Sequence, residues 1–213
     1  MTRPRIAVID YGIGNLHSAQ KSLETCGADA VLTSDPGTIA AADGVVLPGV
    51  GAFGACMDAL RSTGLEGPAL DAVESGRPFL GICVGMQMLF TSSQETPDSA
   101  GLDVIPGVVE WIPPSADLKI PQMQWNRLDV VGRGSTDPML HGLDHDAWLY
   151  FVHSLHGVPS DPSVVVATVE YGSTINAAFR LDNVFAAQFH PEKSSTPGLR
   201  LLTNFVEICG GAR

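Results

Sequence analysis

Short runs of consecutive apolar residues occur through the first half of the chain, at residues 6–9, 30–32, 45–47 and 79–82. A strand with one face in water alternates apolar and polar residues, so these runs are typical of strands buried on both faces. Between them, apolar residues recur at helical spacing, which predicts helices over about 15–26, 55–62, 68–74 and 84–90. Buried strands separated by helices form a parallel sheet.

The second half has a different pattern. Strands are predicted at residues 108–112, 127–131, 148–152, 164–171, 176–181 and 184–189, with few helices between them before a final helix to about residue 208. We therefore expect an α/β fold: an open, mostly parallel twisted sheet with helices on both faces and added antiparallel strands in the second half. Because no polar or Pro/Gly-rich linker divides the chain, we expect a single domain over residues 1–213.

Charge and composition exclude several classes of function. The chain of 213 residues has 12 Lys and Arg against 23 Asp and Glu, a formal net charge of −11. Such a balance disfavours nucleic acid or an anionic membrane as the partner, because both need clustered basic residues. No apolar stretch is suited to a signal peptide or a membrane span, so we expect a cytoplasmic protein.

The four cysteines are far apart and form no C-x-x-C pair, so no metal site is expected. Cys26, Cys56 and Cys209 lie near apolar helix faces and are predicted to be buried thiols. The fourth cysteine has a different setting.

Cys83 lies between the strand predicted at 79–82 and the helix predicted at 84–90, with Gly81 and Gly85 two residues to either side. This is the cysteine counterpart of a nucleophile elbow. A nucleophile on such a sharp turn has a strained backbone and needs small neighbours. The following helix points its positive end at the sulfur, which favours the thiolate, and the N–H of Val84 is free to donate to an oxyanion.

His190 and Glu192 follow the last predicted strand, two residues apart, and Pro191 favours an extended conformation at His190. A thiol nucleophile needs a base, and the base needs a group that orients it. Alone, this pair would be interpreted as a histidine capping a sheet edge beside a solvated glutamate. Together with Cys83, it favours a Cys-His-Glu triad.

A glycine-rich turn follows the strand predicted at 45–47 and precedes a helix. Its residues Gly49, Val50 and Gly51 are candidates to turn a backbone N–H toward a developing oxyanion. Such turns are common. This segment therefore indicates an oxyanion site only in combination with the turn at Cys83 and the segment of His190 and Glu192.

Six segments, at residues 10–16, 48–53, 81–87, 123–126, 150–154 and 188–194, resemble class I, triad-type glutamine amidotransferases. More narrowly, they resemble the glutaminase subunits of imidazole glycerol-phosphate synthase. The segments stand in family order and span most of the chain. The resemblance implies that Cys83 attacks the side-chain amide of glutamine, His190 protonates the leaving ammonia and Glu192 holds the imidazole.

The same resemblance implies further site residues. The oxyanion would be stabilised by the N–H of Val84 and one from residues 49–51. The glutamine-binding residues would be Gln87, Glu95, His153 and Ser154. Relatives commonly have other residues where this chain has Gln122, Gln124 and Leu155.

The resemblance also implies a partner. Ammonia would pass to a separate (β/α)8 cyclase subunit, forming a heterodimer that makes imidazole glycerol phosphate and the aminoimidazole carboxamide nucleotide in histidine biosynthesis. No cofactor, metal or ATP is implied. Candidate residues for the partner interface are Asn15, Met123, Trp125 and Lys193.

Three other functions remain open at this point. The chain would fit a glutaminase subunit for anthranilate, aminodeoxychorismate or pyridoxal phosphate synthesis, although the segments at 123–126 and 150–154 favour histidine biosynthesis. A non-catalytic scaffold is disfavoured by the intact triad residues. A cysteine peptidase of similar architecture is disfavoured by the His-Pro-Glu spacing.

Overall fold

The computed structural model describes residues 2–115, 118–144 and 146–211. Within these ranges, no helix is both long and apolar enough to cross a membrane.

The main sheet contains eight strands in the described ranges, in the order β2-β1-β3-β4-β13-β12-β11-β8. Its first five strands are parallel: β2 (Asp29–Thr33), β1 (Arg5–Ile9), β3 (Gly44–Gly49), β4 (Phe79–Cys83) and β13 (Val184–Ala187). The others, β12 (Thr174–Leu181), β11 (Val165–Glu170) and β8 (Asp129–Val130), pair antiparallel. The predicted parallel sheet with antiparallel additions from the second half is confirmed.

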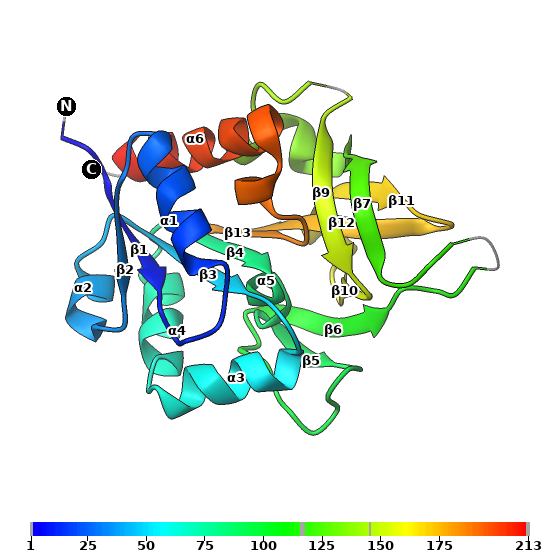
Figure 1. Cartoon of the computed structure of the whole chain (residues 1–213), viewed down its shortest axis with the longest axis horizontal. Coiled ribbons are helices and arrows are strands. Elements are labelled where there is room, and N and C mark those ends of the chain that lie inside the picture. Colours follow the sequence, from blue (N-terminus) through cyan, green and yellow to red (C-terminus); the bar gives the residue numbers. More distant parts are fainter. Residues whose placement is uncertain (1, 116–117, 145, 212–213) are drawn as a thin grey trace.

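Helices cover both faces of this sheet (Figure 1). On one face α1 (Leu16–Thr25) packs against α6 (Ser195–Gly211), and on the other lie α2 (Pro36–Ala40), α3 (Phe53–Ser62) and α4 (Glu66–Glu74). The short helix α2 was not predicted, because it has only one buried residue, Ile39. Asp35 caps it by accepting a hydrogen bond of 2.7 Å from the Thr38 N–H.

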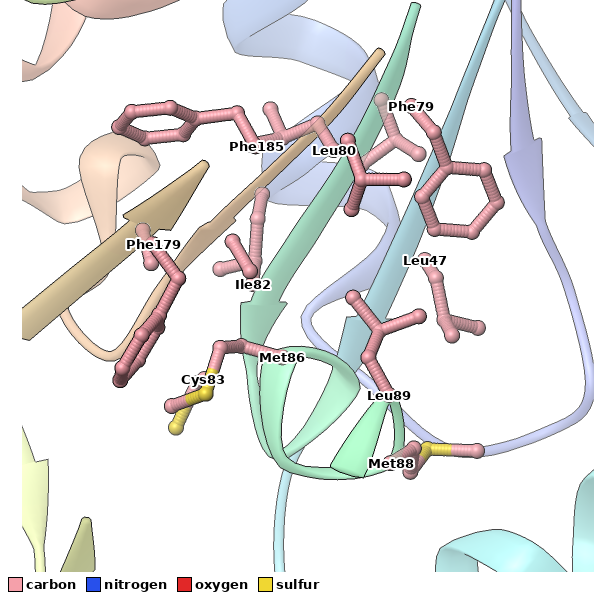
Figure 2. Close-up of a cluster of buried hydrophobic side chains, with 14 of the residues drawn as sticks. Leu47, Phe79, Leu80, Ile82, Cys83, Met86, Met88, Leu89, Phe179 and Phe185 are labelled. Atoms are coloured by element: carbon pink, nitrogen blue, oxygen red, sulfur yellow. The ribbon is translucent and has the colours of Figure 1, made fainter. Parts of the chain in front are cut away.

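The apolar runs of the sequence form strands in the hydrophobic core. Every residue of β3 and β4 is buried, as expected for strands covered by helices on both faces. Figure 2 shows apolar side chains gathered along β4, including Leu80 and Ile82, with Phe179 and Phe185 beside them from β12 and β13. The buried core therefore surrounds the turn that carries Cys83, since Met86, Met88 and Leu89 after it are buried too (Figure 2).

Two smaller sheets complete the second half. One has the order β10 (Leu155–Pro159), β6 (Ile105–Trp111), β5 (Phe90–Ser93), and the other pairs β7 (Gln122–Arg127) with β9 (Trp148–His153). Strands β5, β7 and β10 were not predicted. The sequence of β7 is mostly polar and most of its residues are exposed, so it lacks the apolar pattern of a strand.

The prediction of a helix over residues 84–90 is wrong in its length. The helix is the single turn α5 (Val84–Gln87). The chain leaves the helix because the Leu89 carbonyl accepts a hydrogen bond of 2.8 Å from the Ile105 N–H, which starts the pairing of β5 with β6. The strand predicted at 127–131 is likewise wrong in length, since β8 contains only Asp129 and Val130.

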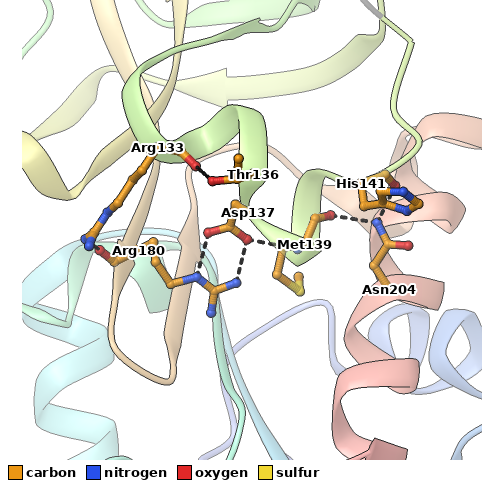
Figure 3. Close-up of polar contacts among 7 residues, drawn as sticks. All are labelled: Arg133, Thr136, Asp137, Met139, His141, Arg180 and Asn204. Carbon is orange, nitrogen blue, oxygen red and sulfur yellow. Dashed lines mark hydrogen bonds and ion pairs between the residues drawn. The ribbon is translucent and has the colours of Figure 1, made fainter.

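The link between β8 and β9 contains the short 3-10 helices η1 (Gly132–Thr136) and η2 (Pro138–Leu140). Asp137 receives two hydrogen bonds of 2.7 Å from Arg180 on β12 (Figure 3). Asn204 on α6 donates to the carbonyls of Met139 and His141. These contacts tie the link to the main sheet and to α6. Two further 3-10 helices, η3 (Pro162–Val164) and η4 (Pro191–Lys193), lie later in the described part of the chain.

The predicted burial of the structural cysteines is confirmed for Cys56 and Cys209. Cys26 is only partly buried, because it ends α1 near the surface, where its thiol contacts the Leu199 carbonyl oxygen at 3.4 Å.

Candidate active site

Cys83 stands where β4 meets α5, in a strained backbone conformation with φ of 55°. A side chain on Gly85 would overlap the Leu47 carbonyl oxygen, and a Cβ on Gly81 would lie 2.9 Å from Leu89 Cδ1. The strain and the need for small neighbours, both predicted from the Gly-x-Cys-x-Gly pattern, are confirmed. Since α5 is one turn long, its dipole is weaker than that of the longer helix predicted there.

The carboxyl ends of β3, β4 and β13 meet at one edge of the sheet, where α/β proteins place their ligands. Gly49 stands in register beside Cys83. A Cβ on Gly49 would lie only 2.5 Å from the Gly85 nitrogen, so the glycine lets the two backbones approach. The segment after β13 brings His190 to the same edge.

His190 and Glu192 form a buried pair. The two atoms His190 Nδ1 and Glu192 Oε1 are 2.7 Å apart, and the side chains are 2% and 1% exposed. Asn15 adds a longer hydrogen bond of 3.4 Å from its Nδ2 to the same carboxylate oxygen. Although Asn15 directly precedes α1, its side chain makes no capping hydrogen bond to that helix.

Backbone contacts hold the imidazole in place. The His190 N–H donates to the Tyr150 carbonyl at 3.0 Å. The Ser194 hydroxyl donates to the His190 carbonyl at 2.6 Å and accepts from the Tyr150 N–H at 3.0 Å. Ser194 therefore fastens the histidine segment to β9.

The electrostatics favour a charged imidazole. Burial alone lowers the pKa of His190, but the nearby Cys83 sulfur and the hydrogen-bonded Glu192 carboxylate outweigh burial and raise the pKa well above its usual value. Nε2 is buried and has no hydrogen-bond partner among the described residues. The ring is therefore held by Glu192 at Nδ1, and its Nε2 is left for the sulfur.

A pocket of about 500 Å³ opens over Cys83. It brings together most of the predicted site residues: Asn15, Val50, Gly51, Cys83, Val84, Gln87, Glu95, His153, Ser154, His190 and Lys193. Gly49 and Glu192 lie behind this surface, and Met123 and Trp125 do not line it. Pro121, Val152 and Leu155 also line the pocket, without having been predicted to do so.

Two side chains that the sequence did not assign to the site fasten the glycine-rich turn. The Tyr11 hydroxyl donates to the Pro48 carbonyl at 2.7 Å, and the Cys56 thiol contacts the Val50 carbonyl oxygen at 3.2 Å. Both side chains are buried. The peptides on either side of the Gly49–Val50 bond are therefore anchored.

Gln87 and Glu95 line the pocket, but each already has a protein partner. Gln87 Nε2 donates to Gln188 Oε1 at 3.1 Å. Glu95 Oε2 accepts from the Phe53 N–H at 2.7 Å, at the start of α3. Each side chain therefore keeps one polar atom for a ligand.

His153 is a neutral histidine at the pocket wall. Burial lowers its pKa to about 4. Its Nδ1 lies 2.8 Å from the Leu155 carbonyl oxygen, so Nδ1 carries the proton and Nε2 is an acceptor. The atom placed 2.8 Å from Nε2 is Gln122 Oε1, and Gln122 Nε2 has no partner among the described residues. Because Nε2 of His153 is an acceptor, we assign the Gln122 amide the reverse orientation, with its NH2 donating to the imidazole. This departure from the family pattern therefore has a buried partner. Ser154 contributes its carbonyl to an Ile112 N–H at 2.9 Å.

An aromatic path leads from the surface to the triad. Met123 and Trp125 on β7 are 62% and 42% exposed. The Tyr150 ring lies 6.1 Å from Trp125 and 6.4 Å from His190, and Lys193 Nζ stands 5.9 Å over it. The exposed face of β7 is thus continuous with the rim of the pocket. No group of three or more potential ligand side chains in the described ranges is placed to hold a metal ion.

The sequence profile of the family Glutamine amidotransferase class-I matches residues 7–209. The chain therefore belongs to the class-I glutamine amidotransferases. Solved structures share the fold: PurLQS from Thermotoga maritima superposes with a TM-score of 0.76 at 20% identity, covering 97% of this chain and 99% of that one. A structure described as a glutamine amidotransferase gives 0.70 at 22% identity, covering 96% and 98%.

Curated relatives show to which family within this class the chain belongs. The imidazole glycerol phosphate synthase subunit HisH of Synechococcus elongatus is 51% identical over 211 residues, covering 99% of this chain and 96% of the relative. The protein of that name from Syntrophotalea carbinolica is 52% identical, covering 95% and 100%. The one from Methanothermobacter thermautotrophicus is 50% identical, covering 95% and 98%. Within the class, this chain belongs to the HisH family.

Proposed function

We propose that this protein is the glutaminase subunit of an imidazole glycerol phosphate synthase. It hydrolyses glutamine to glutamate and ammonia, and a cyclase subunit uses the ammonia in histidine biosynthesis. The observation that carries the proposal is the convergence of Cys83 and His190 at one pocket, with Glu192 bound to His190 behind it. The chain that holds them is about half identical to HisH subunits over nearly its whole length.

The chemistry follows from the charge state of the pair. The Cys83 thiolate attacks the side-chain carbonyl carbon of glutamine, and the imidazolium of His190 gives its Nε2 proton to the departing amide nitrogen. Ammonia leaves and a thioester remains. Neutral His190 then takes a proton from water, the hydroxide attacks the thioester, and glutamate leaves as the thiolate is regenerated. Glu192 orients the imidazole and stabilises its charged form throughout.

The tetrahedral intermediates need oxyanion donors. Val84 is the first residue of α5, so its N–H has no partner within the helix. We assign it as one donor. The second comes from the anchored segment of Gly49, Val50 and Gly51 on the facing wall of the pocket. One such donor is worth about 10²–10³ in rate.

We also propose a binding surface for the cyclase subunit. It carries Met123, Trp125 and Lys193, with Asn15 at the pocket. Large exposed apolar side chains beside the pocket rim support this, because ammonia must leave the pocket without reaching water. We further propose one domain over residues 1–213, supported by the family match to 7–209. We place the protein in the cytoplasm, where its four free thiols would stay reduced.

The test is co-expression with the cyclase subunit from the same source. We expect the two chains to co-purify and to convert glutamine to glutamate with coupled formation of imidazole glycerol phosphate. Co-purification without glutamate release would support the scaffold function, and cleavage of peptides would support a peptidase. Coupling to a synthase for anthranilate, aminodeoxychorismate or pyridoxal phosphate, with none to the cyclase, would overturn the assignment.

A further inference from the structure

Gln188 is fully buried, and its side-chain amide lies between two residues of the site. Gln188 Oε1 accepts a hydrogen bond of 3.1 Å from Gln87 Nε2, and Gln188 Nε2 lies 3.8 Å from Cys83 Sγ. Its backbone is held as well, since the Gln188 N–H donates to the Ala177 carbonyl at 2.9 Å. The side chain therefore has one position, against the sulfur.

The orientation of this amide is decided by its partners. A buried amide needs acceptors for its N–H groups, and its oxygen is already used by Gln87. A thiolate is a strong acceptor, whereas an amide oxygen turned toward it would repel its charge. The structure has this orientation, with Gln188 Nε2 toward Cys83 and Oε1 toward Gln87.

We propose that Gln188 is a further catalytic residue, whose amide N–H donates to the Cys83 sulfur and holds it as a thiolate aimed into the pocket. Gln87 positions that amide through its own hydrogen bond, in addition to facing the ligand. The sulfur is then supported by the neighbouring positive charge of His190 and by a neutral donor, Gln188. This inference rests on the proposed function, because it requires Cys83 to be the nucleophile.

The experiment uses the complex with the cyclase subunit and the variants Gln188→Met and Gln188→Glu. Methionine keeps the length of the side chain and removes the donor, whereas glutamate keeps the shape and adds a charge. Two quantities are measured at pH 7: the rate at which iodoacetamide alkylates Cys83, followed by mass spectrometry, and kcat and KM for glutamine hydrolysis.

We expect Gln188→Met to lower the alkylation rate and kcat about tenfold, the effect of one hydrogen bond to a charged group, with KM within about twofold. Gln188→Glu should lower both further, because its carboxylate repels the thiolate. Asn204→Ala is the matched control. It removes another buried amide, whose contacts lie with Met139 and His141, and it should leave both rates unchanged.

Alkylation and kcat equal to wild type in both Gln188 variants would overturn the inference. If Gln188→Met does not fold, the near-isosteric Gln188→Glu carries the test alone. Cys83→Ala separates the two proposals. Glutaminase activity that survives this substitution refutes the proposed nucleophile, whereas activity that is lost with it but unaffected by the Gln188 changes refutes only the role of Gln188.

Discussion

The imidazole of His190 and the carboxylate of Glu192 meet at 2.7 Å between Nδ1 and Oε1, with almost no exposure of either side chain to water. The second carboxylate oxygen of Glu192 is buried and has no hydrogen-bond partner among the described residues. The carboxylate therefore depends on the imidazole and on Asn15 for its stabilisation. Removing either the imidazole or the carboxylate leaves the other buried without its charged partner.

Cys83→Ala should abolish glutamine-dependent product formation by the complex, while supplied ammonia should still be used, because the cyclase chemistry is on the other subunit. Glu192→Ala should leave more activity than Cys83→Ala, by roughly one to two powers of ten, since Glu192 orients rather than attacks. Steady-state assays with each nitrogen source measure both effects. Substantial glutaminase activity in Cys83→Ala would make the nucleophile assignment wrong.

The hydroxyl of Tyr11 should matter to glutaminase turnover through the Pro48 carbonyl that it anchors. Tyr11→Phe removes one hydrogen bond and should lower kcat for glutamine by roughly fivefold, about 1 kcal/mol, with ammonia-dependent synthesis unchanged. Tyr171→Phe is the control, because its hydroxyl also donates to a carbonyl, that of Lys119. Equal kcat in both variants would show that the oxyanion segment does not need this anchor.

The peptide between Gly49 and Val50 is expected to switch orientation when the partner binds, because glycine has conformations closed to other residues. The isolated chain should hydrolyse glutamine slowly, and the cyclase with its nucleotide should raise the rate about 10²–10³-fold if it completes the oxyanion hole. Turnover is compared for the free subunit, the complex, and the complex with nucleotide. Three equal rates would show that the hole is already formed.

Lys193→Ala should weaken the complex by about 1 kcal/mol, since the ammonium group stands over Tyr150 at the pocket rim. Trp125→Ala should weaken it by about 2 kcal/mol or more, because exposed tryptophans at interfaces dominate affinity. Dissociation constants are measured by titration calorimetry. Lys21→Ala, at an exposed residue of α1, serves as the control. An unchanged constant for Lys193→Ala removes this residue from the interface.

His153 should make the fold sensitive to acid. Its folded pKa of about 4 lies below the ordinary 6.5, so the unfolded chain binds more protons between these values. The stability it contributes is complete above pH 6.5 and is lost as the pH falls toward 4, by about 3 kcal/mol. Urea denaturation at pH 7.5 and 4.5 should show a smaller loss for His153→Gln than for wild type. The exposed His17→Gln should behave like wild type.

The elements that the sequence predicts correctly are those set by local chemistry. An apolar run such as β4 has few ways to be buried, and Gly81 and Gly85 are needed by the turn at Cys83 whatever lies around it. The spacing of His190 and Glu192 likewise determines their pairing, because both come from one short segment after β13.

Contacts between distant segments were decided only by the tertiary structure. Gln188 reaches Cys83 across 105 residues, and Tyr11 reaches Pro48 across 37, because parallel strands bring their carboxyl ends to one edge of the sheet. The length of α5 was settled in the same way, by the pairing of β5 with β6. Neighbouring residues determine a turn or a local pair, but the partner of a buried polar atom depends on which segments the sheet order places beside it.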